Sequence, residues 1–286
     1  MHKLLKTVII AMPVILVLGG CSRSGDRADS RYLTVKGSDT MVHLASNWAE
    51  AYMQQAGAPD VSVTGGGSGT GIAALLNGTT DICIASREIK PEELELAAEQ
   101  GLEPVETTVA RDGIAVIVNP ANPLNELTLE QIEKIYIGAY TNWQQAGGPD
   151  ANVIVLSRES SSGTYVFFQE RVLNRRDYTP AARLMPATSA IIRTVSEDDW
   201  AIGYVGLGYA LEAGDAVKIL GIKETAESVA ILPSLATVRS GEYPIARALY
   251  IYTSSTPAGN VKELIDFALG PAGRQIVTET GYVPVQ

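Results

Sequence analysis

The sequence is poor in the residues that form metal sites and disulfides. Among its 286 residues there are two Cys and two His. Tetrahedral zinc sites are built mainly from Cys and His side chains, so these few residues exclude such a site unless carboxylates complete it. We therefore predict no bound metal ion.

Basic residues are also scarce, and they form no run along the chain. The 22 Lys and Arg are outnumbered by 32 Asp and Glu, which gives a net charge of −10. A protein that binds nucleic acid needs a basic face that displaces counterions from the phosphates, so we expect no nucleic-acid partner. The apolar content of 46% and the charged content of 19% are instead typical of a folded protein with a real core.

The apolar run at the N-terminus is too short to cross a bilayer. It extends from Val8 to Leu18, whereas a membrane span takes about 20 residues. Two Lys precede the run, and LGGC follows it and ends at Cys21. This pattern resembles a bacterial lipoprotein signal. The resemblance implies that residues 1–20 are a signal peptide and that Cys21 is acylated, for instance with palmitate, as a membrane anchor outside the cytoplasm. An ordinary signal peptide with a chance Cys is the alternative.

A lipidated N-terminus has consequences for the neighbouring residues and for the other Cys. Residues 21–30 are polar and contain Gly and Ser, so we predict a flexible tether. Acylation of Cys21 leaves Cys83 as the only thiol, which excludes an intramolecular disulfide. Cys83 lies in the apolar segment DICIAS and is expected to be a small buried side chain.

From residue 31 onward, strand and helix patterns alternate along the chain. This alternation predicts an α/β protein with mostly parallel sheets, organised as two doubly wound domains. The predicted strands are 32–36, 61–64, 81–86, 113–118, 153–156, 217–222 and 248–252, and 201–210 is strand-like with glycine breaks. The predicted helices are 41–52, 72–76, 91–100, 128–136, 162–173, 187–196, 260–269 and 272–280.

Three loops of Gly and small hydroxyl residues each connect the end of a strand to the start of a helix. They are 37–40 (GSDT), 65–71 (GGGSGTG) and 160–164 (SSSGT). Each offers free backbone N–H groups and hydroxyls at the positive end of a helix dipole, an arrangement that binds oxyanions. Ser and Thr are also common N-caps of any helix, so one such loop would be weak evidence. Three of them at carboxyl ends of strands predict an anion site.

The motifs of nucleotide-binding and hydrolytic enzymes are not present in these loops. GGGSGTG lacks the Lys of a P-loop, and Thr70 replaces the last Gly of both GxGxxG and GxSxG. His43 is the only His after the signal peptide and lies one residue off the apolar stripe of its helix. We expect His43 at the surface or its boundary, without a catalytic role. The sequence therefore predicts a binding protein with no enzymatic activity and no cofactor.

Two Arg residues follow predicted strands at positions suited to anion binding. Arg158 stands immediately before ESSSGT, and Arg87 ends the segment DICIASR. A guanidinium group offers forked donors to a tetrahedral oxyanion and stays charged at any relevant pH. The alternative for each is a surface ion pair, Arg158 with Glu159 or Arg87 with Glu88.

At this point the chain resembles the PstS family, the phosphate-binding proteins of bacterial phosphate ABC transporters. The resembling segments are KGSDTM, GGGSGTGI, DICIASREIKPEE, IYIGAYTNWQQAGGPDANVIVLSRESSSGT and AIGYVGLGYA. The resemblance implies a type II periplasmic-binding-protein fold, in which two α/β lobes joined by two crossing strands close on phosphate. We expect residues 31–115 and 247–286 to form lobe 1 and residues 116–246 to form lobe 2.

The resemblance also implies partners and site residues. We expect a monomer that delivers phosphate to the membrane permease of an ABC transporter. Binding of another tetrahedral oxyanion (sulfate, molybdate or phosphonate) and a role as a cell-surface phosphate sensor are the alternatives. The candidate phosphate-binding residues, with Arg87 included for its position, are Ser38, Asp39, Thr40, Ser68, Gly69, Arg87, Arg158, Ser162, Gly163 and Thr164.

Arg87 marks the place where the chain departs from longer members of the family. Those members carry an Asp there, which accepts the proton of hydrogen phosphate, whereas this chain reads ASR as shorter members do. Asp39 is the natural replacement, because it is the only carboxylate in a site loop. The alternative for Asp39 is a cap on the following helix, and the residues leave both possibilities open.

Overall fold

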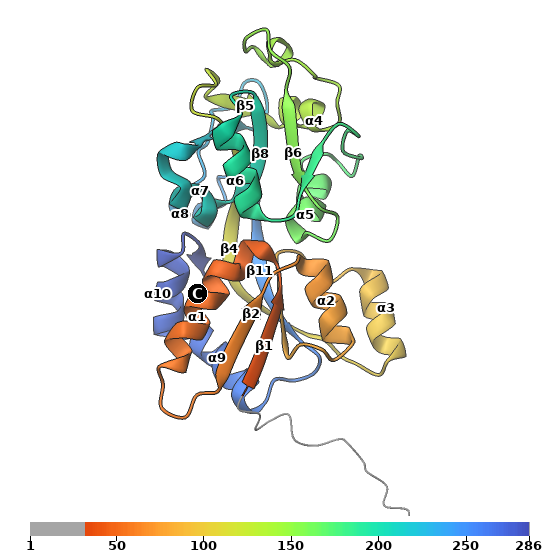
Figure 1. Ribbon diagram of the computed structural model, residues 1–286, viewed down its shortest axis with the longest axis vertical. Helices are drawn as coiled ribbons and strands as arrows, with labels where there is room; N and C mark the ends of the chain where they lie inside the picture. Colours follow the sequence, from red (N-terminus) through yellow and green to blue (C-terminus); the bar gives the residue numbers. More distant parts are fainter. Residues whose placement is uncertain (1–31, 286) are drawn as a thin grey trace, which may run out of the picture.

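The computed structural model describes residues 32–285. The signal peptide, the tether and the lipidated Cys21 that the sequence predicts lie outside the described residues. Two lobes, lower and upper in Figure 1, are joined by strands β4 (Val105–Val118) and β11 (Ala246–Thr253). Within residues 32–285, no helix combines the length and the apolar character that a membrane span requires.

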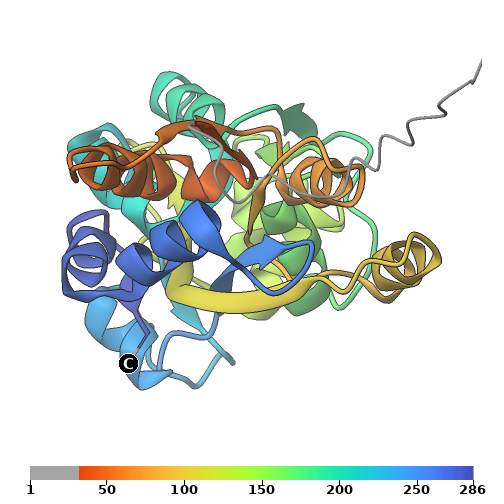
Figure 2. The ribbon, with the colours of Figure 1, turned by 90° about the horizontal axis from the view of Figure 1, so that it is seen from below.

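The lower lobe is a sheet covered by helices on both faces. Side chains from α1, α9 and α10 pack on one face, and side chains from α2 and α3 pack on the other. Figure 2 shows α1 and α10 to the left of the lobe and α2 and α3 to its right. The elements are β1 (Tyr32–Gly37), α1 (Val42–Met53), β2 (Asp60–Thr64), α2 (Ser68–Leu76), β3 (Ile82–Ala85), α3 (Pro91–Glu99), α9 (Gly259–Leu269), α10 (Pro271–Glu279) and β12 (Val283–Pro284).

The upper lobe repeats the layered arrangement around the second half of β4. Its larger core includes the aromatic side chains of Tyr136, Trp143, Phe168 and Tyr204, all fully buried. The elements are β5 (Glu126–Thr128), α4 (Leu129–Tyr136), β6 (Ile154–Arg158), α5 (Gly163–Arg171), β7 (Arg183–Met185), α6 (Thr188–Glu197), β8 (Ala201–Gly206), α7 (Leu207–Ala213), β9 (Lys218–Ile219), β10 (Gly221–Lys223) and α8 (Leu235–Ser240). Short 3-10 helices are Asp39–Met41, Trp143–Ala146 and Gly214–Ala216.

The directions of the strands distinguish the lobes from their connection. The main sheet follows the order β2-β1-β3-β11-β4-β8-β6-β7. Strands within one lobe pair in parallel, as β1 does with β2 and β3, and β6 with β7 and β8. Every antiparallel ladder between the described strands includes β4 or β11, the two crossing strands. The predicted two-lobed α/β fold is confirmed, and the sheets are parallel except where the chain crosses between lobes.

Three predicted elements differ from those observed. The segment 217–222, expected as one strand, is the two strands β9 and β10, which belong to separate sheets. β4 begins at Val105 and not at residue 113, because its first half alternates exposed and buried residues on a half-covered sheet. The segment 201–210, expected as one interrupted strand, is strand β8 followed by helix α7. Its glycines serve close packing, since a Cβ on Gly208 would lie 2.3 Å from the carbonyl oxygen of Thr280.

The boundaries of the lobes remain a proposal, and the buried clusters support them. One set of clusters gathers side chains from β1, β3, β11 and the first half of β4. The other gathers side chains from β6, β8 and the second half of β4, beginning with Ile114. We therefore propose the expected boundaries, 31–115 with 247–286 as lobe 1 and 116–246 as lobe 2, with the difference that Ile114 and Ala115 pack in the clusters of lobe 2.

Candidate functional site

The three Gly- and hydroxyl-rich loops meet where the two lobes face each other. Loops 37–40 and 65–71 come from lobe 1, and loop 160–164 comes from lobe 2. The backbone N–H of Gly69 donates to the carbonyl of Ser161 at 2.9 Å, which joins the lobes directly. The predicted residues at this junction with buried side chains are Ser38, Thr40, Ser68, Arg158, Ser162 and Thr164.

Two glycines permit this close approach of the lobes. Gly67 has φ +96°, and a Cβ there would lie 2.6 Å from the carbonyl oxygen of Ser161. A Cβ on Gly163 would lie 2.3 Å from Oγ of Ser68. Any side chain at either position would therefore push one lobe away from the other.

Three serine hydroxyls gather on the lobe 1 side of the junction. Ser38 Oγ donates to Ser86 Oγ at 2.9 Å, and the backbone N–H of Ser86 donates to Ser68 Oγ at 3.0 Å. Ser162 acts differently, because its Oγ accepts from the N–H groups of Thr164 and Tyr165 and caps α5. Ser and Thr in these loops could bind a ligand or cap a helix. Ser162 caps its helix, whereas Ser38 and Ser68 do not.

Arg158 and Asp39 form an ion pair across the junction. Nη2 of Arg158 lies 2.5 Å from Oδ2 of Asp39, and Oδ1 of Asp39 accepts from the N–H of Gly66 at 3.0 Å. Asp39 therefore joins two loops and a strand end and does not cap the following helix. Arg158 pairs with Asp39 and not with its neighbour Glu159.

The remaining donors of Arg158 are largely used within lobe 2. Nη1 donates to Thr188 Oγ1 at 2.9 Å, Nη2 to the carbonyl of Pro186 at 3.0 Å, and Nε to the carbonyl of Met185 at 3.3 Å. A guanidinium has five N–H donors, so these bonds and the one to Asp39 leave a single N–H of Nη1. The arrangement fixes the guanidinium rigidly and leaves one charge-assisted donor for a ligand.

Arg87 forms an ion pair of its own within lobe 1. Its Nη1 and Nη2 each lie 2.7 Å from a carboxylate oxygen of Glu93 on α3. Burial acts to raise the pKa of Glu93, but hydrogen bonds and charge from Arg87 and Lys90 hold it below its ordinary value. The ion-pair alternative is therefore realised with Glu93 and not with Glu88, and a contact between Arg87 and the ligand stays a prediction.

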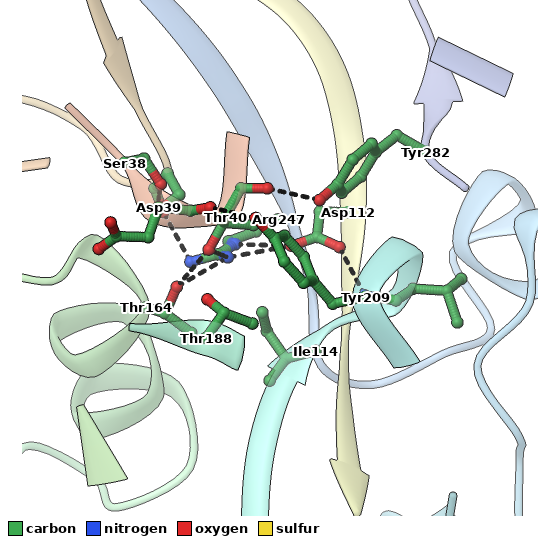
Figure 3. A network of polar contacts seen from close by, with 12 residues as sticks. Ser38, Asp39, Thr40, Asp112, Ile114, Thr164, Thr188, Tyr209, Arg247 and Tyr282 are labelled. Carbon is green, nitrogen blue, oxygen red and sulfur yellow. Dashed lines mark hydrogen bonds and ion pairs between the residues drawn. The ribbon is translucent and has the colours of Figure 1, made fainter. Parts of the chain in front are cut away.

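Arg247 and Asp112 form a second buried ion pair at the junction, which the sequence analysis missed. Asp112 Oδ2 accepts from Nη2 of Arg247 at 3.0 Å and from Nε at 3.3 Å (Figure 3). Nη2 also donates to Oγ1 of Thr164 at 3.0 Å and to Oγ1 of Thr40 at 3.3 Å, while Nη1 donates to the carbonyl of Ser86 at 2.9 Å. Arg247 thus contacts site residues of both lobes.

A signal for this pair exists in the sequence. Arg247 is an isolated charge in the apolar strand ARALYIY, and Asp112 immediately precedes the apolar segment GIAVIV. A lone charge in a strand that is otherwise buried needs a partner, and these two opposite charges stand in the two crossing segments. Burial raises the pKa of Asp112, and the adjacent Arg247 opposes that effect.

Two tyrosines fix the backbone of the first loop. Tyr209 donates its hydroxyl to the carbonyl of Asp39 at 2.9 Å, and Tyr282 donates to the carbonyl of Thr40 at 2.6 Å (Figure 3). Burial raises the pKa of Tyr209 to about 12, so its hydroxyl remains a donor at neutral pH. The loop is therefore held from both lobes.

The two other side chains that the sequence analysis considers, His43 and Cys83, lie outside this junction. His43 is at the surface, as expected, where its Nδ1 lies 3.0 Å from Oε2 of Glu212. Cys83 is a buried free thiol, and burial raises its pKa. Among residues 32–285, no group of three or more His, Cys, Asp or Glu is placed to hold a metal ion.

Comparisons with known proteins agree with this geometry. A family model described as the PBP superfamily domain matches residues 22–272. The phosphate-binding protein PstS of Bacillus subtilis is 31% identical, over 92% of this chain and 84% of that protein. Protein SphX of Synechococcus elongatus is also 31% identical, over 98% of this chain and 86% of that protein.

A solved structure from Clostridium perfringens, named for a phosphate ABC transporter substrate-binding protein with bound phosphate, is 29% identical. It superposes with a TM-score of 0.81 over 89% of this chain and 100% of that chain. The sequence matches, the two-lobed fold and the loops at the junction all lead to one assignment. The chain belongs to the PstS family of phosphate-binding proteins, within the PBP superfamily.

Proposed function

We propose that this protein captures inorganic phosphate between its two lobes and delivers it to the permease of an ABC transporter. The observation that carries the proposal is the meeting of buried hydroxyls with the Arg158 guanidinium at the carboxyl ends of β1 and β6. Both lobes contribute donors, so an anion bound there would hold the lobes together. The names of the relatives support phosphate as the anion.

The proposed ligand contacts come from all three loops and two arginines. Hydroxyl, backbone N–H and guanidinium groups are all donors to an oxyanion, and a hydrogen bond to a charged group contributes roughly 1.5–3 kcal/mol. These groups can bind phosphate, and the one carboxylate among the proposed residues, Asp39, is paired with Arg158. We therefore propose binding without catalysis. The proposed residues are Ser38, Asp39, Thr40, Ser68, Gly69, Arg87, Arg158, Ser162, Gly163 and Thr164.

Calorimetric titration of the purified, phosphate-stripped protein tests the proposal. Phosphate, sulfate and molybdate are titrated separately at pH 6 and pH 8. We expect phosphate to bind at both pH values and more tightly than the other two anions. Tighter binding of sulfate or molybdate, or no binding of phosphate, would overturn the assignment.

We also propose that the protein is a monomer anchored outside the cytoplasm by lipid on Cys21. The sequence LGGC supports the anchor, and one acyl chain alone binds membranes only marginally, so several chains are expected. The variant Cys21→Ser should leave the membrane fraction, or remain unprocessed, and still bind phosphate. A fully processed Cys21→Ser protein that stays on membranes would contradict the anchor.

A further inference from the structure

Two threonine hydroxyls from opposite lobes lie against the same arginine nitrogen. Oγ1 of Thr40 and Oγ1 of Thr164 are 2.8 Å apart, and both lie within hydrogen-bond distance of Nη2 of Arg247. Both threonines are almost completely buried. Figure 3 shows the two hydroxyls beside the guanidinium at the junction of the lobes.

Hydrogen-bond chemistry fixes what this contact does to the hydroxyls. A guanidinium only donates, whereas a hydroxyl has one proton and two lone pairs. Nη2 of Arg247 has two N–H groups and one of them bonds Asp112, so the two threonine oxygens share the other. Each threonine must therefore direct its own proton away from Arg247. One proton bonds the neighbouring threonine oxygen, because the two oxygens are 2.8 Å apart. The other proton is left for a ligand at the junction of the lobes. An oxyanion accepts hydrogen bonds only, so it needs hydroxyl protons directed toward it.

Arg247 is itself held independently of the three loops. Asp112 binds it with two hydrogen bonds, and Asp112 Oδ1 also accepts from the N–H of Leu207 at 3.1 Å. Arg247 and Asp112 are direct partners in the ladder between β11 and β4. The ring of Phe167 lies 5.5 Å from the guanidinium carbon. The donor is therefore placed by the crossing strands and by the upper lobe.

We propose that Arg247, held by Asp112, is a positioning residue for phosphate binding. It turns the hydroxyl protons of Thr40 and Thr164 away from itself, so that one bonds the other threonine and the remaining one is directed toward the bound anion. This inference rests on the proposed function and assigns a residue that acts through the two threonines.

A double-mutant design tests whether Arg247 acts through the hydroxyls. Removing one partner would leave a buried charge unpaired, whereas replacing both by apolar residues is often tolerated. The combined change Arg247→Met with Asp112→Leu is therefore made in the natural protein and in a Thr164→Val background. We expect at least a tenfold loss of phosphate affinity in the natural protein and a clearly smaller loss in the Thr164→Val background.

Equal losses in both backgrounds, or no loss in the natural protein, would overturn the proposal. Where binding is too weak for calorimetry, the rise of Tm with phosphate at millimolar concentration gives the affinity. The matched control replaces the Arg176–Glu133 ion pair of lobe 2 by Met and Leu, which should leave affinity unchanged. If the natural protein does not bind phosphate, the proposed function itself is wrong. If it binds phosphate but the losses do not follow the expected pattern, only the role of Arg247 is wrong.

Discussion

The ion pair between Asp39 and Arg158 places opposite charges at the point where an anion is expected. Asp39 is partly exposed and Arg158 is buried. Because the carboxylate offsets the guanidinium charge, net attraction alone cannot hold a multivalent anion strongly. Binding then depends on directed donors, which distinguish anions by geometry and by protonation.

Arg158→Ala should weaken phosphate binding by at least about tenfold, since a charge-assisted hydrogen bond contributes roughly 1.5–3 kcal/mol. The change also leaves Asp39 without its partner beside the anion, which adds repulsion. Calorimetry at pH 7 measures the effect. Arg193→Ala is the control, because Arg193 pairs with Glu197 on the exposed face of α6. Unchanged affinity of the Arg158 variant would restrict that residue to the ion pair with Asp39.

Asp39→Asn tests whether this carboxylate accepts the proton of hydrogen phosphate. Phosphate keeps a proton near neutral pH and sulfate does not, so an accepting carboxylate would reject sulfate by repulsion and by a missing donor. We expect the ratio of phosphate to sulfate affinity to fall at least about tenfold, mainly because sulfate gains. A parallel change of both affinities would show that Asp39 only balances the charge of Arg158.

Local sequence identifies the site loops but not the partners of their side chains. The GSDT, GGGSGTG and SSSGT loops are recognisable because Gly and hydroxyl residues at a strand end are a local signal. The pairing of Asp39 with Arg158 links residues 119 positions apart. The pairing of Asp112 with Arg247 depends on the register of β4 with β11. Neither pairing can be predicted from one segment of the sequence alone.

At the scale of elements, helix α3 is tied to the end of β3 by the pair Arg87–Glu93. Glu93 also accepts from the backbone N–H of Lys90, completing the start of the helix. Arg87 is buried and Glu93 is only partly exposed. The helix is therefore docked by a charged contact in addition to its few apolar ones.

Glu93→Gln should lower the free energy of unfolding at pH 7 by roughly 1.5–3 kcal/mol, since it removes charged hydrogen bonds to Arg87. The pKa of Glu93 is lowered in the folded state, so its contribution is present above the ordinary value of about 4.3 and is lost as pH falls through the lower folded value. Urea unfolding of both proteins between pH 3 and pH 7 measures the difference. A difference that does not shrink toward acid pH would contradict this account.

Elements with a local signal are the ones that the sequence predicts well. Helix α1 and strand β1 have clear apolar periodicities, and they lie within a residue or two of their expected ends. The first half of β4 and the helix α7 were missed. Both depend on tertiary packing, β4 through its partner β11 and α7 through the close approach of Gly208 to Thr280.

At the scale of the whole molecule, the structure is a closed arrangement of lobes. Small-angle scattering should show a smaller radius of gyration with phosphate than without it, because the proposed ligand contacts come from both lobes. Gly67→Ala is an informative variant, since its Cβ would lie 2.6 Å from the carbonyl oxygen of Ser161. We expect this variant to remain expanded at phosphate concentrations that compact the natural protein. Identical curves for the natural protein with and without phosphate would indicate a rigid site.

Strand β4 runs without interruption from the lower lobe into the upper lobe, and its residues belong to the cores of both lobes. Unfolding of either lobe would therefore also remove the support that β4 gives to the core of the other lobe. The two lobes should lose their structure together, in one cooperative transition whose calorimetric and van't Hoff enthalpies agree. Two resolved transitions in the heat-capacity curve would refute this. Cooperativity of this kind means that a destabilising substitution in one lobe lowers the unfolding temperature of the other lobe as well.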